Sequence, residues 1–83
     1  INPMAPIHVV VIPKQKLCSL DQLSTKGSSK VIIQLIKSIK VIVDCLKIQN
    51  GYRLICNNGF DAGQEVPHVH FHILAGKKLG KII

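Results

Sequence analysis

Histidine and apolar residues alternate without interruption over residues 68–73. Successive side chains of a β-strand point to opposite faces, so this pattern predicts a strand over residues 67–74. His68, His70 and His72 are expected on one face, and Val69, Phe71 and Ile73 on the other. At about 3.3 Å rise per residue, neighbouring histidines lie roughly 6–7 Å apart along their face. We therefore expect one side of this strand to be buried and the other to present a row of imidazoles.

A second pattern has the period of an α-helix and covers residues 30–49. Polar residues recur every three or four positions and form one stripe, which consists of Lys30, Gln34, Lys37, Lys40, Asp44 and Lys47. The rest of the segment is mostly aliphatic, so the helix has a wide apolar face that needs a sheet or a partner subunit to cover it. Its charges argue against a membrane span. The Asn50-Gly51 pair is predicted to end the helix, because Gly51 can adopt the left-handed conformation.

The remaining patterns are shorter. Residues 8–12 are β-branched and apolar on both faces, which predicts a central strand ended by Pro13. A helical turn capped by Ser19 is expected over residues 19–23, and serines before the long helix can cap it. Residues 52–57 predict a further strand, joined to the histidine strand by a glycine-bearing loop that favours an antiparallel pair. The chain is thus predicted to be a single α+β domain over residues 1–83, with an antiparallel meander sheet and one long helix.

Composition narrows the possible classes of function. With 83 residues, 47% of them hydrophobic, the chain suits one small domain with an aliphatic core. Three cysteines without a C-x-x-C pair argue against a disulfide scaffold or a cysteine zinc site, and favour a reducing, cytoplasmic location. The net charge is +7, but the lysines are scattered and are not interleaved with aromatic residues. We therefore expect neither nucleic acid nor a membrane as the partner, and a small anionic ligand instead.

Three interpretations of the histidine row compete at this point. It is a polar strand face open to water, or a His-x-His metal site, or a centre for catalysis on a phosphate. The loop before it favours the third, because Gly59 and Gly63 are expected to expose N–H groups and Asn57 and Gln64 add amide donors. The only nearby carboxylates that could ligate a metal are those of two loop residues, Asp61 and Glu65.

The residues expected to perform this chemistry also resemble the sequence motif of a known family. The sequence His68-Val69-His70-Phe71-His72 resembles the signature of the histidine triad family, in which histidines alternate with hydrophobic residues. Residues 5–14, residues 51–54 with Asn57, and residues 63–66 resemble other segments of the same family. The subgroup that the chain most resembles is the Hint-type purine nucleoside phosphoramidases. The resemblance implies a hydrolase of nucleoside 5′-phosphoramidates or acyl and aminoacyl adenylates, with an AMP-like ligand, no cofactor and a homodimeric state.

The resemblance also implies a role for each histidine. His70 falls at the nucleophile, which forms a nucleotidyl-histidine intermediate. His72 falls at a position that contacts a phosphate oxygen and assists the leaving group. His68 and His8 fall at the supporting histidines, although His8 by itself is more simply a strand-end residue. Two rival interpretations stay open: a nucleotide-binding module without turnover, and a metal-binding protein.

The resemblance places the phosphate contacts in the loop before the triad. The positions concerned are Asn57, Gly63, Gln64 and the backbone of Glu65. Glu65 stands where animal members carry serine and is typical of bacterial members. The family domain normally begins with further strands that contact the nucleoside, and these are expected to be absent here. Two interpretations follow: residues 1–83 are a fragment of a longer product, or the nucleoside half of the site is incomplete.

Overall fold

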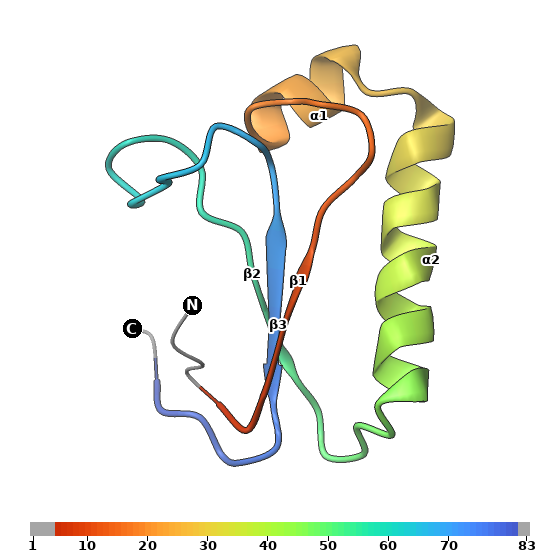
Figure 1. Cartoon of the computed structure of the whole chain (residues 1–83), viewed down its shortest axis with the longest axis vertical. Helices are drawn as coiled ribbons and strands as arrows, with labels where there is room; N and C mark the ends of the chain where they lie inside the picture. Colours follow the sequence, from red (N-terminus) through yellow and green to blue (C-terminus); the bar gives the residue numbers. More distant parts are fainter. Residues whose placement is uncertain (1–4, 82–83) are drawn as a thin grey trace.

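The structure is a computed structural model that describes residues 5–81. Three strands, β1 (Ile7–Val11), β2 (Arg53–Ile55) and β3 (Phe71–Ala75), form one antiparallel sheet in the order β1-β3-β2. Two helices, α1 (Leu20–Lys26) and α2 (Ser29–Cys45), connect β1 to β2, and α2 runs beside the sheet (Figure 1). The predicted α+β class, with an antiparallel sheet and one long helix, is confirmed.

The position of β1 differs from the prediction. A meander in chain order would place β2 in the middle, and the apolar residues 8–12 predicted a central β1. Instead β3 is the central strand and, among the described residues, β1 pairs on one side alone. The reason is that α2 carries the chain across the sheet, so β2 enters on the far side of β3. The regular part of the histidine segment is also shorter than predicted, because β3 begins only at Phe71.

The long helix begins as predicted but ends earlier. The hydroxyl of Ser28 accepts a hydrogen bond from the Val31 N–H at 3.2 Å and caps α2. At the other end Lys47 takes the left-handed conformation, with φ of 54°. The N–H groups of Lys47 and Ile48 bond the carbonyls of Asp44 and Val43, which is the pattern of a Schellman motif. The predicted end at Gly51 was therefore wrong, since a lysine ends the helix before the glycine.

The short helix α1 is capped differently from the prediction. Ser19 occupies the N-cap position, but its side chain makes no capping hydrogen bond. The side-chain oxygen of Asn58 instead accepts from the Leu20 N–H at 2.7 Å. A residue distant in sequence thus fixes the start of α1, and it ties this helix to the loop that precedes the histidines.

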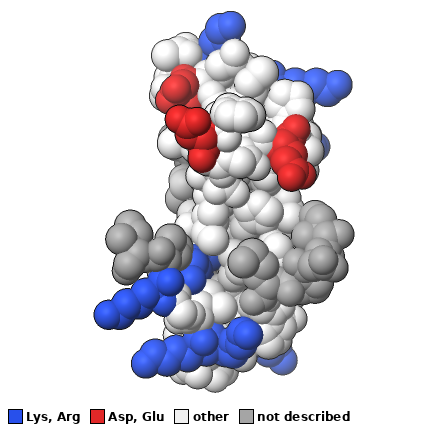
Figure 2. All heavy atoms as spheres, turned by 90° about the vertical axis from the view of Figure 1, so that its left-hand side faces the viewer, with Lys and Arg blue, Asp and Glu red and all other residues white. Residues whose placement is uncertain are grey.

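Charged side chains are distributed unevenly over the surface. On the face seen in Figure 2, the acidic side chains of the described residues lie in the upper half, whereas basic side chains lie at both the upper and the lower end. No helix among residues 5–81 is both long and apolar enough to cross a membrane.

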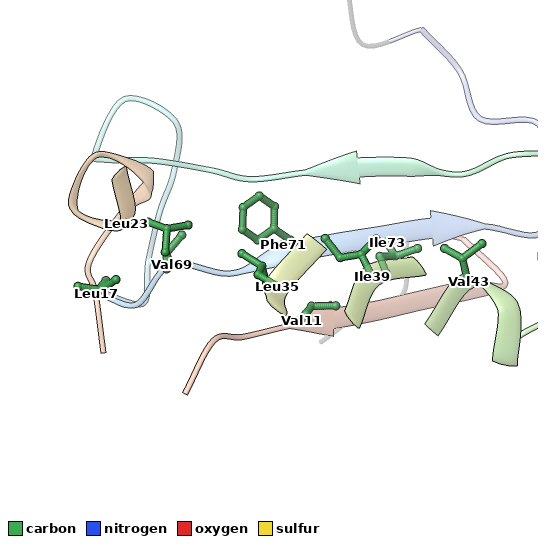
Figure 3. Close-up of a cluster of buried hydrophobic side chains, with 9 residues drawn as sticks. All are labelled: Val11, Leu17, Leu23, Leu35, Ile39, Val43, Val69, Phe71 and Ile73. Atoms are coloured by element: carbon green, nitrogen blue, oxygen red, sulfur yellow. The ribbon is translucent and has the colours of Figure 1, made fainter. Parts of the chain in front are cut away.

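The core lies between the sheet and the two helices (Figure 3). The side chains of Val69, Phe71 and Ile73 point from the histidine segment into it, and Val69 and Ile73 are fully buried. The other members are Val11, Leu17, Leu23, Leu35, Ile39 and Val43. The alternation predicted from the sequence is thereby confirmed on its apolar side. The apolar side chains of this segment fix the direction in which the histidines point.

Candidate active site

The sheet register places the side chains of His8 and His72 on the face that α2 does not cover. His72 lies opposite Val10 of β1 and Ile55 of β2, while His8 lies opposite Leu74. Paired residues of antiparallel strands share a face, so His8 and His72 are diagonal neighbours on it. His70 is two residues before His72 and extends the row beyond the end of the strand.

A hydrogen bond joins the two histidines that lie on neighbouring strands. His8 Nε2 and His72 Nδ1 are 2.8 Å apart, and their ring centroids are 5.1 Å apart. One of these nitrogens must carry the proton and the other must accept it. The structure therefore brings His8 into the group, although the two residues are 64 positions apart in the sequence.

His70 is held by the backbone of the same segment. Its Nδ1 lies 2.9 Å from the carbonyl oxygen of His68. A carbonyl oxygen can only accept, so Nδ1 must be the protonated nitrogen. In the neutral imidazole this leaves a lone pair on Nε2, the nitrogen at the far end of the ring. The backbone thus selects the tautomer in which the outer nitrogen of His70 can act as a nucleophile.

His68 is hydrogen-bonded to the segment that follows β1, and not to another histidine. Its Nε2 lies 3.2 Å from the carbonyl oxygen of Pro13, just beyond the end of β1. The neighbouring Val69 N–H donates to the carbonyl of Leu17 at 2.7 Å. These two bonds anchor the histidine segment to residues 13–17. His68 therefore positions the backbone whose carbonyl fixes His70.

The environment of His72 favours its neutral form. Its neighbours across the sheet are the aliphatic Val10 and Ile55, and His70 packs edge-on against it with ring centroids 5.0 Å apart. Burial lowers the pKa of His72 below its ordinary value of 6.5, and the proximity of His70 and His8 lowers it further. The lowered pKa favours the neutral imidazole. An anionic ligand would oppose that effect and favour the protonated ring.

The residues do not form a metal centre within the part of the chain that the structure describes. Among residues 5–81, no three His, Cys, Asp or Glu side chains converge in a way that could hold a metal ion. The hydrogen bond between His8 and His72 and the bond from His68 to Pro13 also occupy one nitrogen of each ring.

The loop before the histidines is fixed by the side chain of Gln64. Its Oε1 accepts from the Gly59 N–H at 2.8 Å, and its Nε2 donates to the carbonyls of Cys18 at 2.6 Å and Val66 at 3.1 Å. All of these partners are backbone groups. Gln64 therefore closes the loop on itself and ties it to the segment before α1, so any bond from its side chain to a phosphate would compete with these bonds.

The two loop glycines are used differently from the prediction. The Gly59 N–H donates to Gln64, and the Gly63 N–H donates to the carbonyl of Phe60 at 3.0 Å. The expectation that both N–H groups stand free is therefore wrong. Their φ angles of 83° and 77° give the physical reason for glycine, because the loop turns through left-handed conformations at both positions.

Two other groups of the loop are available to a ligand. The half-buried side chain of Asn57 and the N–H of Glu65 have no hydrogen-bond partner among residues 5–81. Both belong to the predicted set of phosphate contacts. The contacts themselves stay a prediction, as do the roles of Gly63 and Gln64.

Comparison with known proteins identifies the family to which this arrangement belongs. Residues 1–79 match the model of the HIT domain. The chain belongs to the HIT domain family.

Individual members of the family agree with this assignment. An uncharacterized HIT-like protein of Azospirillum brasilense is 40% identical over 84 residues, an alignment that covers 100% of this chain and 69% of the relative. A histidine triad protein of Clostridium difficile superposes with a TM-score of 0.87 at 41% identity, over 99% of this chain and 71% of that one. A HIT family hydrolase of Clostridium thermocellum gives 0.88 at 39% identity, over 100% and 73%.

Two features of this HIT domain were not predicted from its sequence. The carbonyl of Pro13 holds His68, and the side chain of Asn58 links α1 to Cys56 by bonding the Leu20 N–H and, at 3.2 Å, the Cys56 carbonyl. A carbonyl has no signature in a sequence, so the first could not have been found. The second had a weak signal, because asparagine in a glycine-bearing loop often bonds nearby backbone groups.

Proposed function

We propose that this HIT-domain chain is a hydrolase that cleaves nucleoside 5′-phosphoramidates, or acyl and aminoacyl adenylates, through a nucleotidyl-histidine intermediate on His70. Its resemblance to Hint-type purine nucleoside phosphoramidases supports this substrate class. The similarity to a protein described as a HIT family hydrolase, from Clostridium thermocellum, supports hydrolysis as the reaction.

The bond between His70 Nδ1 and the His68 carbonyl carries the proposal. It fixes the proton on Nδ1 and leaves the lone pair of Nε2 directed outward. In the first step this lone pair attacks the α-phosphorus, a P–N bond to His70 forms, and the bond from phosphorus to the amine or acyl oxygen breaks. In the second step water attacks the same phosphorus and gives a proton to His72 Nε2, which lost its proton to the leaving group in the first step, while the bond to His70 breaks and the nucleoside monophosphate leaves.

His72 supports the first step by donating from its second nitrogen. When His8 Nε2–H donates to His72 Nδ1, the proton of neutral His72 is on Nε2. That N–H is then free to bond a phosphate oxygen, and once the ring is protonated it can give the Nε2 proton to the departing group. The lowered pKa of His72 makes it a better acid once a phosphate group has favoured its protonation.

The loop supplies the remaining contacts in this proposal. We place the Asn57 amide and the Glu65 N–H against the phosphate, because both are unengaged among residues 5–81. Gln64 and Gly63 shape the loop through the bonds described above. Gln64 is thus a positioning residue in this proposal.

A homodimer is proposed as the working form. Leu54 of the edge strand β2 exposes 42% of its surface, and Tyr52, just before this strand, exposes 47%. Ile33 and Ile36 of α2 are exposed as well. A second copy would cover such apolar side chains. Light scattering at micromolar concentration should give twice the mass of the chain, and a monomer mass would contradict this part of the proposal.

The test of the proposed reaction is turnover of adenosine 5′-phosphoramidate with and without a chelator. We expect chelator-resistant release of AMP, and mass spectrometry of the quenched enzyme should detect a nucleotidyl adduct. In His70→Asn the side-chain amide can still donate to the His68 carbonyl, but no nucleophilic nitrogen remains. Turnover should fall by a factor on the order of 10⁴ or more, with little change in stability.

Other outcomes would identify the rival functions. Turnover lost to the chelator would favour a metal-binding protein, and AMP binding without any turnover would favour a nucleotide-binding module. Unchanged turnover in His70→Asn would refute His70 as the nucleophile. The Lys37→Gln variant, changed on the outer face of α2, serves as the control.

A further inference from the structure

A basic hollow lies at the end of the molecule opposite α1. It is formed by residues 47–51 after α2, residues 76–78 after β3 and Ile7 of β1, and has a volume of about 620 Å³. Neighbouring residues of a strand point to opposite faces, so Ile7 and His8 face opposite sides of the sheet. The basic hollow is therefore separate from the histidine site.

The charge of the basic hollow is positive and uncompensated. Three lysines, Lys47, Lys77 and Lys78, line it, and among residues 5–81 no carboxylate does. Within residues 5–81 these three ammonium groups have no hydrogen-bond or ion-pair partner. The one acidic residue of α2, Asp44, is already paired with Lys40 at 2.7 Å.

The other acidic residues of the chain are at the far end of the molecule. Asp21 lies in α1, and Asp61 and Glu65 lie in the loop before the histidines. Both segments are at the top of Figure 1, whereas the end of α2 and residues 76–78 are at the bottom. On the face seen in Figure 2 the acidic side chains all lie in the upper half, so the basic side chains of the lower end have no acidic neighbour there, whereas further basic side chains lie near the acids at the upper end. Mutual repulsion of the lysines is therefore not offset by nearby acids.

Helix capping does not explain these lysines. Three carbonyls of the last turn of α2, those of Ile42, Val43 and Asp44, already accept from backbone N–H groups at 3.0 to 3.2 Å. Lysine side chains are therefore not needed to satisfy them. Each of the two segments that line the hollow, residues 47–51 and residues 76–78, contains a glycine in the left-handed conformation. The φ angles are 95° at Gly51 and 98° at Gly76.

The lining specifies the chemical class of the ligand. Besides the three lysines, the lining includes Gln49 and Asn50, whose side-chain amides are further hydrogen-bond donors. Its apolar residues are Ile7 and Ile48. None of its lining residues within the described part of the chain is aromatic, so these residues offer no surface on which a base could stack. Its volume is in the range of small-molecule sites. Three lysines that line one hollow match an anion that carries several negative charges close together.

We propose that the basic hollow binds a small molecule with two or more linked phosphate groups through Lys47, Lys77 and Lys78. This proposal does not depend on the hydrolase activity. A single phosphate is expected to bind more weakly, because it carries fewer charges than the lysines can neutralise.

The test is a titration of the full chain with sodium tripolyphosphate, followed by amide chemical shifts in NMR. We expect shifts concentrated in residues 47–51 and 76–78, and weaker binding of orthophosphate. The triple variant Lys47→Gln/Lys77→Gln/Lys78→Gln should bind tripolyphosphate about tenfold more weakly, since each exposed pair contributes little alone. The same spectra show whether the variant is folded.

A matched control separates a local site from general attraction. The variant Lys16→Gln/Lys26→Gln/Lys37→Gln removes the same charge elsewhere, and should change binding about twofold at most. Equal weakening in both variants would overturn the proposal, as would shifts confined to the histidines and residues 57–66. Tighter binding of a short oligonucleotide than of tripolyphosphate would also overturn it. Turnover of the phosphoramidate should be the same in the wild type and in both variants.

Discussion

The two faces of residues 68–75 share one backbone but are held in place by different forces. Toward α2, Val69 and Ile73 are fully buried, and burial stabilises them in proportion to their area without regard to direction. On the opposite face, the histidines are half-buried and each ring nitrogen that bonds has one defined partner. Substitutions on the first face should therefore change stability, and substitutions on the second should change chemistry.

The largest effect on stability is expected at the centre of the apolar face. Replacing Ile73 with alanine leaves a cavity against α2, and should lower the free energy of unfolding by about 2–5 kcal/mol. Urea denaturation measures this change. Val41→Ala removes two methyl groups from an exposed position of α2 and should change stability by less than about 0.5 kcal/mol. Equal losses in the two variants would show that the apolar face is not the main source of stability.

A smaller effect is expected in the loop that joins the two faces. Gln64→Ala removes three hydrogen bonds to backbone groups, and should lower the free energy of unfolding by about 1–3 kcal/mol. Because the loop positions the phosphate contacts in the proposed site, KM for the phosphoramidate should rise more than kcat falls. Gln34→Ala, on the exposed side of α2, is the control. Unchanged KM together with lost stability would limit Gln64 to a structural role.

The smallest effect is a pH dependence of stability on the histidine face. The pKa of His72 is below 6.5 in the folded protein, chiefly through burial, so the unfolded chain binds more protons as the pH falls. Stability should therefore decrease as the pH drops through 6.5 toward the lower pKa of the folded state. Urea denaturation between about pH 8 and pH 5 should show this decrease, and a smaller slope in His72→Asn. The same slope in both proteins would assign the pH dependence to another group.

Much of the fold was predictable because its patterns are local. The alternation over residues 68–73 predicted which side chains are buried, and the three- to four-residue period after Lys30 predicted α2. The limits of the elements were less predictable. Lys47 ends the helix in a conformation that glycine usually adopts, and β3 begins only after His70, where pairing with β1 begins. Such limits depend on hydrogen bonds to other segments, which a local pattern does not contain.

By itself the sequence predicted that Val69, Phe71 and Ile73 point into the core and that His70 and His72 lie together on the other side, because side chains alternate in extended backbone. It also determined the helix that covers the apolar face. Only the tertiary structure decided that His8 joins His72, that the His68 carbonyl holds His70 Nδ1, and that Pro13 holds His68. It likewise decided that Lys47 lies beside Lys77 and Lys78 in one hollow. The physical reason is that backbone carbonyls and distant neighbours become partners only when the strands are in register.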